Sequence, residues 1–504
     1  MASEARAPSH ISHPLSPAYV AFLAVLVFFL YFYRSSAVGL VGPDEPRYAQ
    51  VAREMLRSGD WITPHLMGEP WLEKPPLYYW LAAACFKVGG VNEQTARLPA
   101  ALFAAGFLVF FGWLGQRLFP GETMRYALPI LLTSVGWIGF ARAASMEMLF
   151  ASSLSGALLA LALWLWQGRR RWLFTFAGLL ALSTLAKGLA GIVLAALILF
   201  LYCLITREWR WLLRVLNPWA VVLFAVVALP WYAAMTFKHG DVFIQDFIIK
   251  HHFKRFLTDE LAHPGPWWFY LPVLLAGLFP WTAHLGTLRP GDLQRDNRRL
   301  FLLIWALVML AFFSISQGKL PGYILPVLPA LALWIGEDWK RASRTRVRVI
   351  SALQAFMLLA LGLAGSLPDA LARGVGRASL SFSGTTVMAA VVALLLIWLA
   401  WRGRRFGAAV LIAIIPPCFL LWLLTAVAPH VDQRASARPI AAAVCGRQFA
   451  LGEVRRHVRY GLQFYCDRRM SDAPGAEYVL SSADIPGAQP VQRFPEAGLT
   501  LWKK

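Results

Sequence analysis

The chain has 504 residues, of which 58% are hydrophobic and 15% are charged, and its formal net charge is +21. Soluble globular domains are about 45–50% apolar and about 25% charged, so this composition excludes an ordinary soluble enzyme, a disordered protein and a disulfide scaffold. The basic residues stand in short clusters between apolar runs, which is typical of membrane-protein loops and not of a nucleic-acid interface. We therefore expect an all-α polytopic membrane protein without a nucleic-acid partner.

Thirteen apolar runs approach the roughly 17–25 residues that a membrane-spanning helix needs. The two runs on either side of Lys187-Gly188 could instead form one long kinked helix. In chain order the predicted spans are residues 18–33, 98–118, 126–140, 148–166, 172–185, 189–205, 219–237, 267–285, 300–316, 320–335, 349–367, 386–401 and 408–427.

The short loops between these spans alternate in charge. Loops after even-numbered spans carry basic clusters, such as the three arginines at 169–171. The short loops after spans 3, 5, 9 and 11 carry only Arg142, Lys187, Lys319 and the pair Arg373 and Arg377. Because Lys and Arg are retained in cytoplasmic loops, we predict a cytoplasmic N-terminus. With thirteen spans the C-terminus is then periplasmic.

Three long polar regions fall on the non-cytoplasmic side. Two are loops, 34–97 and 238–266, of a transmembrane domain that we assign to residues 1–429. The third, residues 430–504, mixes short strand-like runs with Gly and Pro turns and is predicted to form a small α/β domain. It contains Cys445 and Cys466. Since that compartment permits disulfides, we predict that they pair, with two unpaired thiols as the alternative.

The first long loop opens a helix at Asp44-Glu45-Pro46, with an acidic N-cap followed by proline in the first turn. Gly59 is placed to end this helix. An apolar stripe follows at helical spacing, which suits a helix in the membrane interface: Tyr48, Val51, Ala52, Met55 and Leu56. By spacing alone, Asp44 could serve only as a helix cap.

A second helix is predicted to start at Glu73-Lys74-Pro75-Pro76, and its apolar side chains return the chain to the membrane. Backbone N–H groups at a helix start favour an anion, so Lys74 beside them could hold a phosphate. A surface ion pair at the helix start is the alternative.

This loop resembles the first periplasmic loop of the bacterial lipid A aminoarabinose transferases, in the protein O-mannosyltransferase-like superfamily. The resemblance lies in the runs Asp44-Glu45-x-Arg47-Tyr48-Ala49, Ser58-Gly59-Asp60-Trp61 and Glu73-Lys74-Pro75-Pro76-Leu77. Residues 251–256 and 263–268 resemble the family's second long periplasmic loop, and residues 316–326 resemble its Lys…Tyr-x-Leu-Pro segment. The resemblance implies a C-type glycosyltransferase fold.

The resemblance also implies roles for residues at matching positions. Asp44 and Glu147 would be the catalytic acids. Glu147 stands where the family usually has Asp, and its extra methylene moves the carboxylate by roughly 1 Å, which matters in a preorganised site. Glu73 and His251 would be associated with a divalent metal ion, although no firm metal requirement is implied. The substrate-binding residues would be Arg47, Lys74, Arg255, Lys319 and Tyr323.

The implied function is transfer of a sugar from polyprenyl (undecaprenyl) phosphate to lipid A or another envelope acceptor, among the lipids of the bacterial inner membrane. The default sugar is 4-amino-4-deoxy-L-arabinose, transferred with inversion at the anomeric carbon. Transfer of another sugar to a protein or polysaccharide is an alternative. A polytopic transporter is the alternative from another class, but transporters usually carry charged sites near the midplane, whereas these spans are nearly free of charge.

Overall fold

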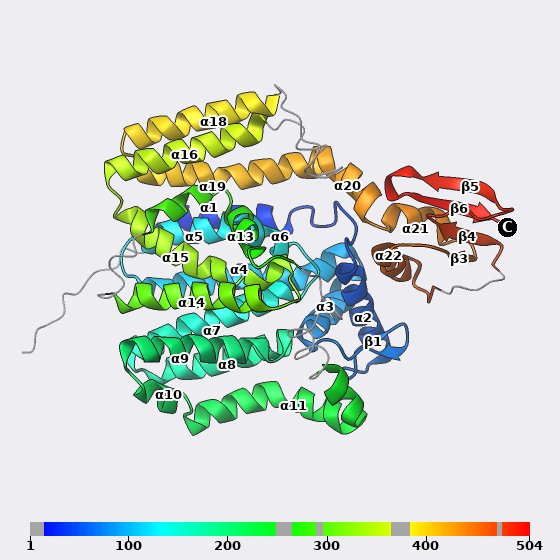
Figure 1. Ribbon diagram of the computed structural model, residues 1–504, viewed down its shortest axis with the longest axis horizontal. Coiled ribbons are helices and arrows are strands. Elements are labelled where there is room, and N and C mark those ends of the chain that lie inside the picture. The colour runs from blue at the N-terminus through cyan, green and yellow to red at the C-terminus, as the bar shows by residue number, and fades with distance from the viewer. Residues whose placement is uncertain (1–14, 248–264, 289–295, 364–383, 471–475) are drawn as a thin grey trace, which may run out of the picture.

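The computed structural model describes residues 15–247, 265–288, 296–363, 384–470 and 476–504. Figure 1 shows a stack of long helices with a smaller, sheet-containing unit at one end. The described elements that precede this unit are α1 (Pro17–Val27), η1 (Phe28–Phe32), α2 (Asp44–Ser58), β1 (His65–Leu66), β2 (Glu69–Pro70), α3 (Leu77–Gly89), α4 (Glu93–Leu118), α5 (Thr123–Thr133), α6 (Val135–Ala141), α7 (Glu147–Gln167), α8 (Arg170–Lys187), α9 (Ala190–Thr206), α10 (Arg210–Arg214), α11 (Pro218–Phe243), α13 (Tyr270–Leu278), η3 (Thr282–Thr287), α14 (Asn297–Ile315), η5 (Pro321–Ile324), α15 (Val327–Lys340), α16 (Arg344–Leu363), α18 (Gly384–Trp401), α19 (Arg405–Trp422) and η7 (Leu423–Val427).

Every predicted span has a helical counterpart in the described chain. The helices α8 and α9 are separate and lie side by side, so the alternative of one long kinked helix around Gly188 is wrong. Among the described helices, six are long and apolar enough to cross a membrane, or seven if α5 and α6, which meet at 59°, form one span. The predicted span at 267–285 contains only the nine-residue α13 and the 3-10 helix η3. The count of thirteen crossings therefore stays a prediction.

Helix α7 forms the centre of the stack. Its apolar stretch is wholly buried, and it packs against both α4 and α8. Gly156 allows this close approach, because a Cβ at that position would come within 3.1 Å of Leu179 in α8 and 3.4 Å of Phe110 in α4. Glu147 is the first residue of α7, so a buried helix fixes its position.

The first long loop forms the two predicted helices. Gly59 adopts a left-handed backbone (φ 69°) directly after α2, and α3 begins directly after Pro76. One detail of the prediction is wrong: the N-cap of α2 is Pro43, Asp44 is the first helical residue, and no side chain caps this end. The carboxylate of Asp44 does not cap the helix because it pairs with Arg47 instead.

The C-terminal unit contains a small sheet, as predicted. Strands β3 and β4 pair in parallel, and β4, β6 and β5 pair antiparallel in the order β3-β4-β6-β5. The helices pack on this sheet around a separate apolar core that includes Val444, Leu462, Leu480 and Leu501. Its elements are α20 (Ala428–Ala435), α21 (Arg438–Val444), β3 (Phe449–Leu451), α22 (Arg456–Cys466), β4 (Tyr478–Ser481), β5 (Gln489–Phe494), η8 (Pro495–Ala497) and β6 (Leu499–Lys503).

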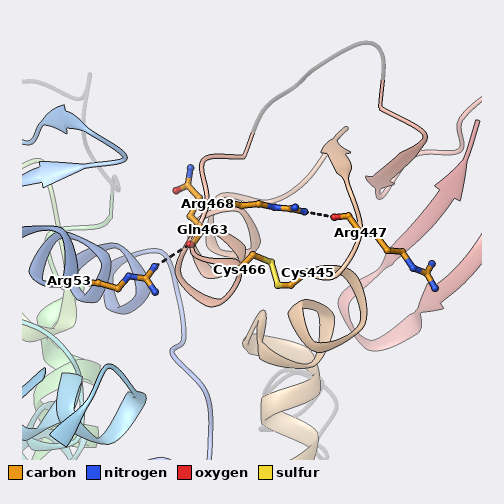
Figure 2. The surroundings of a disulfide bond; sticks show 6 residues. All are labelled: Arg53, Cys445, Arg447, Gln463, Cys466 and Arg468. Atoms are coloured by element: carbon orange, nitrogen blue, oxygen red, sulfur yellow. Dashed lines mark hydrogen bonds between the residues drawn. A yellow bond between two sulfur atoms is a disulfide. The ribbon is translucent and has the colours of Figure 1, made fainter. Parts of the chain in front are cut away.

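Cys445 and Cys466 form a disulfide, which confirms the predicted pairing (Figure 2). Cys445 directly follows α21 and Cys466 is the last residue of α22. The bond therefore ties the ends of these two helices together.

Candidate active site

The start of α2 is anchored by a buried ion pair that the sequence analysis did not single out. The Glu45 carboxylate accepts hydrogen bonds from Arg97 Nε (3.1 Å) and Nη2 (2.6 Å) and from the amides of Val41 (2.8 Å) and Ala144 (2.6 Å). Both side chains are under 10% exposed. Arg97 stands at the start of α4 and Ala144 lies just before α7, so this pair joins three segments. No local sequence pattern predicts that Glu45 and Arg97, which are 52 residues apart, form a pair.

Asp44, the neighbour of Glu45, has a different environment. Its Oδ1 accepts one hydrogen bond from Arg47 Nη2 at 2.6 Å, and 45% of its side chain is exposed. The Arg47 side chain is only 9% exposed, because its guanidinium lies over the rings of Trp71 (4.9 Å), Tyr48 (5.3 Å) and Tyr460 (5.5 Å). The predicted acid is thus accessible, while its cation is covered by aromatic rings.

Glu147 is held by a cation from another helix. It forms an ion pair with Lys187, the last residue of α8, and both side chains are largely buried. The Lys187 ammonium lies 4.1 Å from the ring centroid of Tyr323 in η5. The predicted residues Glu147 and Tyr323 therefore come together through Lys187, which the sequence analysis noted only as a loop charge.

The phenol of Tyr48 is influenced by the charges of both acidic residues. Burial raises the pKa of its phenol well above the usual value, and the carboxylates of Asp44 and Glu147 raise it further. Both carboxylates are therefore within electrostatic range of one ring. The Tyr48 ring also packs against the rings of Tyr78 and Tyr79, with ring centroids 6.1 Å apart in each pair, so aromatic contacts join α2 to the first turn of α3.

The other predicted site residues have different environments. Lys319 is buried, and its Nζ donates a hydrogen bond to Ser316 O at 2.6 Å. Glu73 and Lys74 are half-buried in the segment just before α3, and the charge of Glu73 acts on Arg47. His251 and Arg255 lie outside the described residues.

The long extramembrane regions meet at this end of the molecule. Asp60 in the first loop pairs with Lys238 Nζ at 2.7 Å, and Trp231 Nε1 donates to Ile62 O at 2.8 Å. Burial alone would raise the pKa of Asp60, but hydrogen bonds from Lys238 and from the amides of Thr63 and Ile62 outweigh it and lower the pKa to about 2. The first loop is therefore fastened to the end of α11, where the second loop begins.

Comparison with known proteins finds similar sequences and a similar fold. Residues 73–233 match the family described as Dolichyl-phosphate-mannose-protein mannosyltransferase. The chain is 36% identical over 335 residues to an undecaprenyl phosphate-alpha-4-amino-4-deoxy-L-arabinose arabinosyl transferase of Pseudomonas paraeruginosa, covering 65% of this chain and 60% of that protein. A Pseudomonas fluorescens transferase of the same description is 38% identical over 311 residues, covering 59% of this chain and 52% of that protein.

The chain thus spans about 60% of the length of the curated relatives that it matches. A crystal structure of ArnT from Cupriavidus metallidurans bound to undecaprenyl phosphate matches 97% of this chain and 98% of its own, with a TM-score of 0.77 and 23% identity. Its likeness shows the same fold. As its motifs predicted, the chain is similar in sequence to bacterial aminoarabinose transferases, and it has the fold of ArnT.

Proposed function

We propose that the protein is a membrane glycosyltransferase that moves a sugar, by default 4-amino-4-deoxy-L-arabinose, from undecaprenyl phosphate to lipid A or another envelope acceptor. The observation that carries this proposal is the proximity of the Asp44–Arg47 and Glu147–Lys187 pairs, because Glu45, next to Asp44, accepts a hydrogen bond from the amide of Ala144, three residues before Glu147. The relatives described above bear this activity in their names.

We propose that the protein lies in the bacterial inner membrane with thirteen crossings, a cytoplasmic N-terminus and a periplasmic C-terminus. Helix α7 is long enough to cross the membrane, since its 21 residues span about 30 Å, the thickness of a bilayer core. The charges at its two ends support the orientation. The site residue Glu147 begins α7 and the arginines 169–171 follow its other end. The transmembrane domain would comprise residues 1–429, with periplasmic loops 34–97 and 238–266, and residues 430–504 would form the periplasmic α/β domain.

The reaction would be a single displacement with inversion at the anomeric carbon, in which polyprenyl phosphate leaves. Charge grows on the phosphate oxygens in the transition state, so fixed cations stabilise it. Lys74 at the start of α3 and Arg255 in the second loop are the cations that we assign to this task. Arg47 would belong to the substrate-binding set as well, because it pairs with the exposed carboxylate of Asp44.

The role of Asp44 depends on the acceptor. A hydroxyl acceptor needs a general base, and the exposed Asp44 carboxylate could accept its proton. A phosphate of lipid A is already an anionic nucleophile, and Asp44 would then orient the acceptor or the amino group of the donor sugar. Glu147 would act as the second acid, with Lys187 holding it beside Tyr323 and Lys319 contributing to the substrate-binding surface.

The described residues do not by themselves form a metal site. Within the described ranges, no group of three or more His, Cys, Asp or Glu side chains converges, and Glu73 already faces the positive charge of Arg47. His251, the other predicted ligand, lies outside these ranges. We therefore assign no step to a metal ion.

The direct test is transfer by purified protein in lipid nanodiscs, supplied with labelled undecaprenyl-phosphate aminoarabinose and lipid A. We expect labelled lipid A without any membrane gradient, and mass spectrometry of lipid A from cells with and without the protein would identify the sugar. Absence of transfer from aminoarabinose, galactosamine and hexose donors alike, to lipid A, protein and polysaccharide acceptors, would contradict the proposal. Asp44→Asn protein is the matched control.

A further inference from the structure

Helix α22 of the C-terminal unit lies along α2, the helix that carries Asp44 and Arg47 (Figures 1 and 2). The residues of α22 and its C-cap that contact α2 follow the spacing i, i+3, i+4 and i+7, which is one face of a helix. They are Tyr460, Gln463, Phe464 and Asp467. Each of them meets an arginine of α2.

Two of these arginines fix the register of the two helices. The Arg53 guanidinium lies 4.9 Å from the ring centroid of Phe464, and its Nη2 is 3.0 Å from Asp467 Oδ1. Arg57 donates two hydrogen bonds to the same carboxylate, at 2.8 and 2.5 Å. Bidentate pairs of this kind are geometrically specific, so α22 has one preferred position along α2.

The unit is also held from the start of α4. Glu93 Oε1 accepts a hydrogen bond from the Tyr465 hydroxyl at 3.0 Å and lies 3.3 Å from Arg438 Nη1. The same hydroxyl accepts from Leu40 N at 2.8 Å. The disulfide ties the end of α22 to α21, so these two helices are held together. Contacts with α2 and with α4 therefore fix both helices of the unit.

This docking brings Tyr460 to the third arginine, Arg47. The centroid of its ring is 5.5 Å from Arg47 Cζ, and it completes the set of three rings around that guanidinium. A ring over a guanidinium attracts the cation, more strongly where water is excluded. Without Tyr460, the guanidinium would gain access to water and would be held less firmly against Asp44.

We propose that the C-terminal unit completes the active site, with Tyr460 as a positioning residue that covers Arg47 and holds it toward Asp44. This inference rests on the proposed sugar transfer for its kinetic consequence, although not for the contact itself. It predicts that a residue far from the membrane domain in sequence affects donor binding.

The kinetic test compares Tyr460→Ala with Tyr460→Phe in the transfer assay. Loss of a cation–π contact raises KM for the polyprenyl-phosphate sugar by about threefold to thirtyfold, with a smaller change in kcat, and Phe recovers most of the loss because it keeps the ring. In an Arg47→Gln background, which has no cation for the ring to cover, the same Ala substitution should have little further effect. Equal effects of Tyr460→Ala in both backgrounds would overturn the proposal.

Tyr478→Ala is the matched control for general damage to the unit. Its ring centroid lies 5.4 Å from Cζ of another arginine, Arg447. Tyr478 is in β4 and is not part of the α22 face that contacts α2. We expect KM for the donor to stay near the wild-type value in this variant. A similar rise in KM in both tyrosine variants would mean that stability of the unit, and not the cover of Arg47, is what matters.

A second readout does not depend on activity. In protein whose free cysteines Cys85, Cys203 and Cys418 are changed to Ser, Arg47→Cys replaces the covered side chain by a thiol at the same position of α2. Labelling by a water-soluble maleimide should be slow and should accelerate severalfold when Tyr460→Ala is added. Wild-type protein that transfers no sugar would refute the proposed function, whereas an unchanged labelling rate would refute the cover by Tyr460.

Discussion

Two of the regions in which the described chain buries charged residues differ in how they hold their carboxylates. In the first region, near the end of α15, Arg299 Nη2 lies 2.6 Å from Asp338 Oδ1 and both side chains are at most 2% exposed. The adjacent Glu337 is 5% exposed and pairs with Lys340 and Arg341. These contacts join α14 to α15, and the Glu337 carboxylate also accepts a hydrogen bond from Thr123 in α5.

In the second region, around Tyr48, the cations are covered while one carboxylate stays open. Arg47 and Lys187 are largely buried, but Asp44 is 45% exposed. Burial of charge alone therefore does not identify a site, because helix-joining pairs show it as well. What distinguishes the candidate site is an accessible acid beside a cation that aromatic rings hold in place.

The largest expected effect separates the two regions directly. Arg299→Ala leaves Asp338 buried without its cation, and we expect a loss of about 3–5 kcal/mol of stability. Thermal unfolding in detergent measures this loss, with the exposed neighbour variant Arg298→Ala as control. The folded fraction should keep its specific activity, and a specific loss of transfer in folded Arg299→Ala protein would contradict the division into two regions.

Lys187→Met should lower both the stability of the protein and sugar transfer, because Lys187 is buried and also belongs to the candidate site. We expect a loss near the lower end of about 3–5 kcal/mol, since Glu147 would lose its partner, together with loss of transfer. Adding Glu147→Gln removes the unpaired charge and should recover the unfolding temperature without recovering activity. Recovery of both in the double variant would show that the pair is only structural.

Loss of the disulfide should have a smaller effect on stability, confined to the C-terminal unit. Replacing Cys445 and Cys466 by Ser is expected to destabilise the C-terminal unit by about 2–4 kcal/mol. Limited proteolysis should then cut within this unit first, while the helices around α7 remain protected. Unchanged protease resistance of the unit would show that its apolar core suffices.

The smallest effect concerns pH. The pKa of Asp60 is about 2 in the folded protein, below its unfolded value of about 3.9. Its contribution to the free energy of unfolding is therefore complete above about pH 4 and is lost as the pH falls toward 2. Hydrogen exchange at Ile62 and Thr63 should therefore stay slow at pH 3. In Lys238→Ala protein, which lacks the hydrogen bond that lowers the pKa, protection should disappear at a higher pH.

Local patterns were enough to predict much of the fold. Apolar runs predicted the long helices, and Pro76 and Gly59 marked the start of α3 and the end of α2, because these residues act through the backbone of their own segment. The N-cap at Asp44 was predicted wrongly for a related reason. Capping preferences describe an isolated helix end, whereas Arg47, one turn away, captures this carboxylate.

The site could be predicted only in part. Motifs singled out Asp44, Arg47, Glu147 and Tyr323 as candidates, but not the partners that hold them. Arg97, Lys187 and Tyr460 reach the site from distant parts of the chain, and no spacing rule connects residues so far apart in sequence. Such partners depend on tertiary packing, which places one helix end against another.

The measurement that tests the central claim most directly is sugar transfer by Asp44→Asn protein. Because Asp44 is half-exposed and does not cap α2, the variant should fold and unfold like the wild type. If the carboxylate takes part in the reaction, kcat should fall by about 10²-fold or more. Transfer at the wild-type rate by folded Asp44→Asn protein would contradict the account, and Glu147 would then be the acid to test.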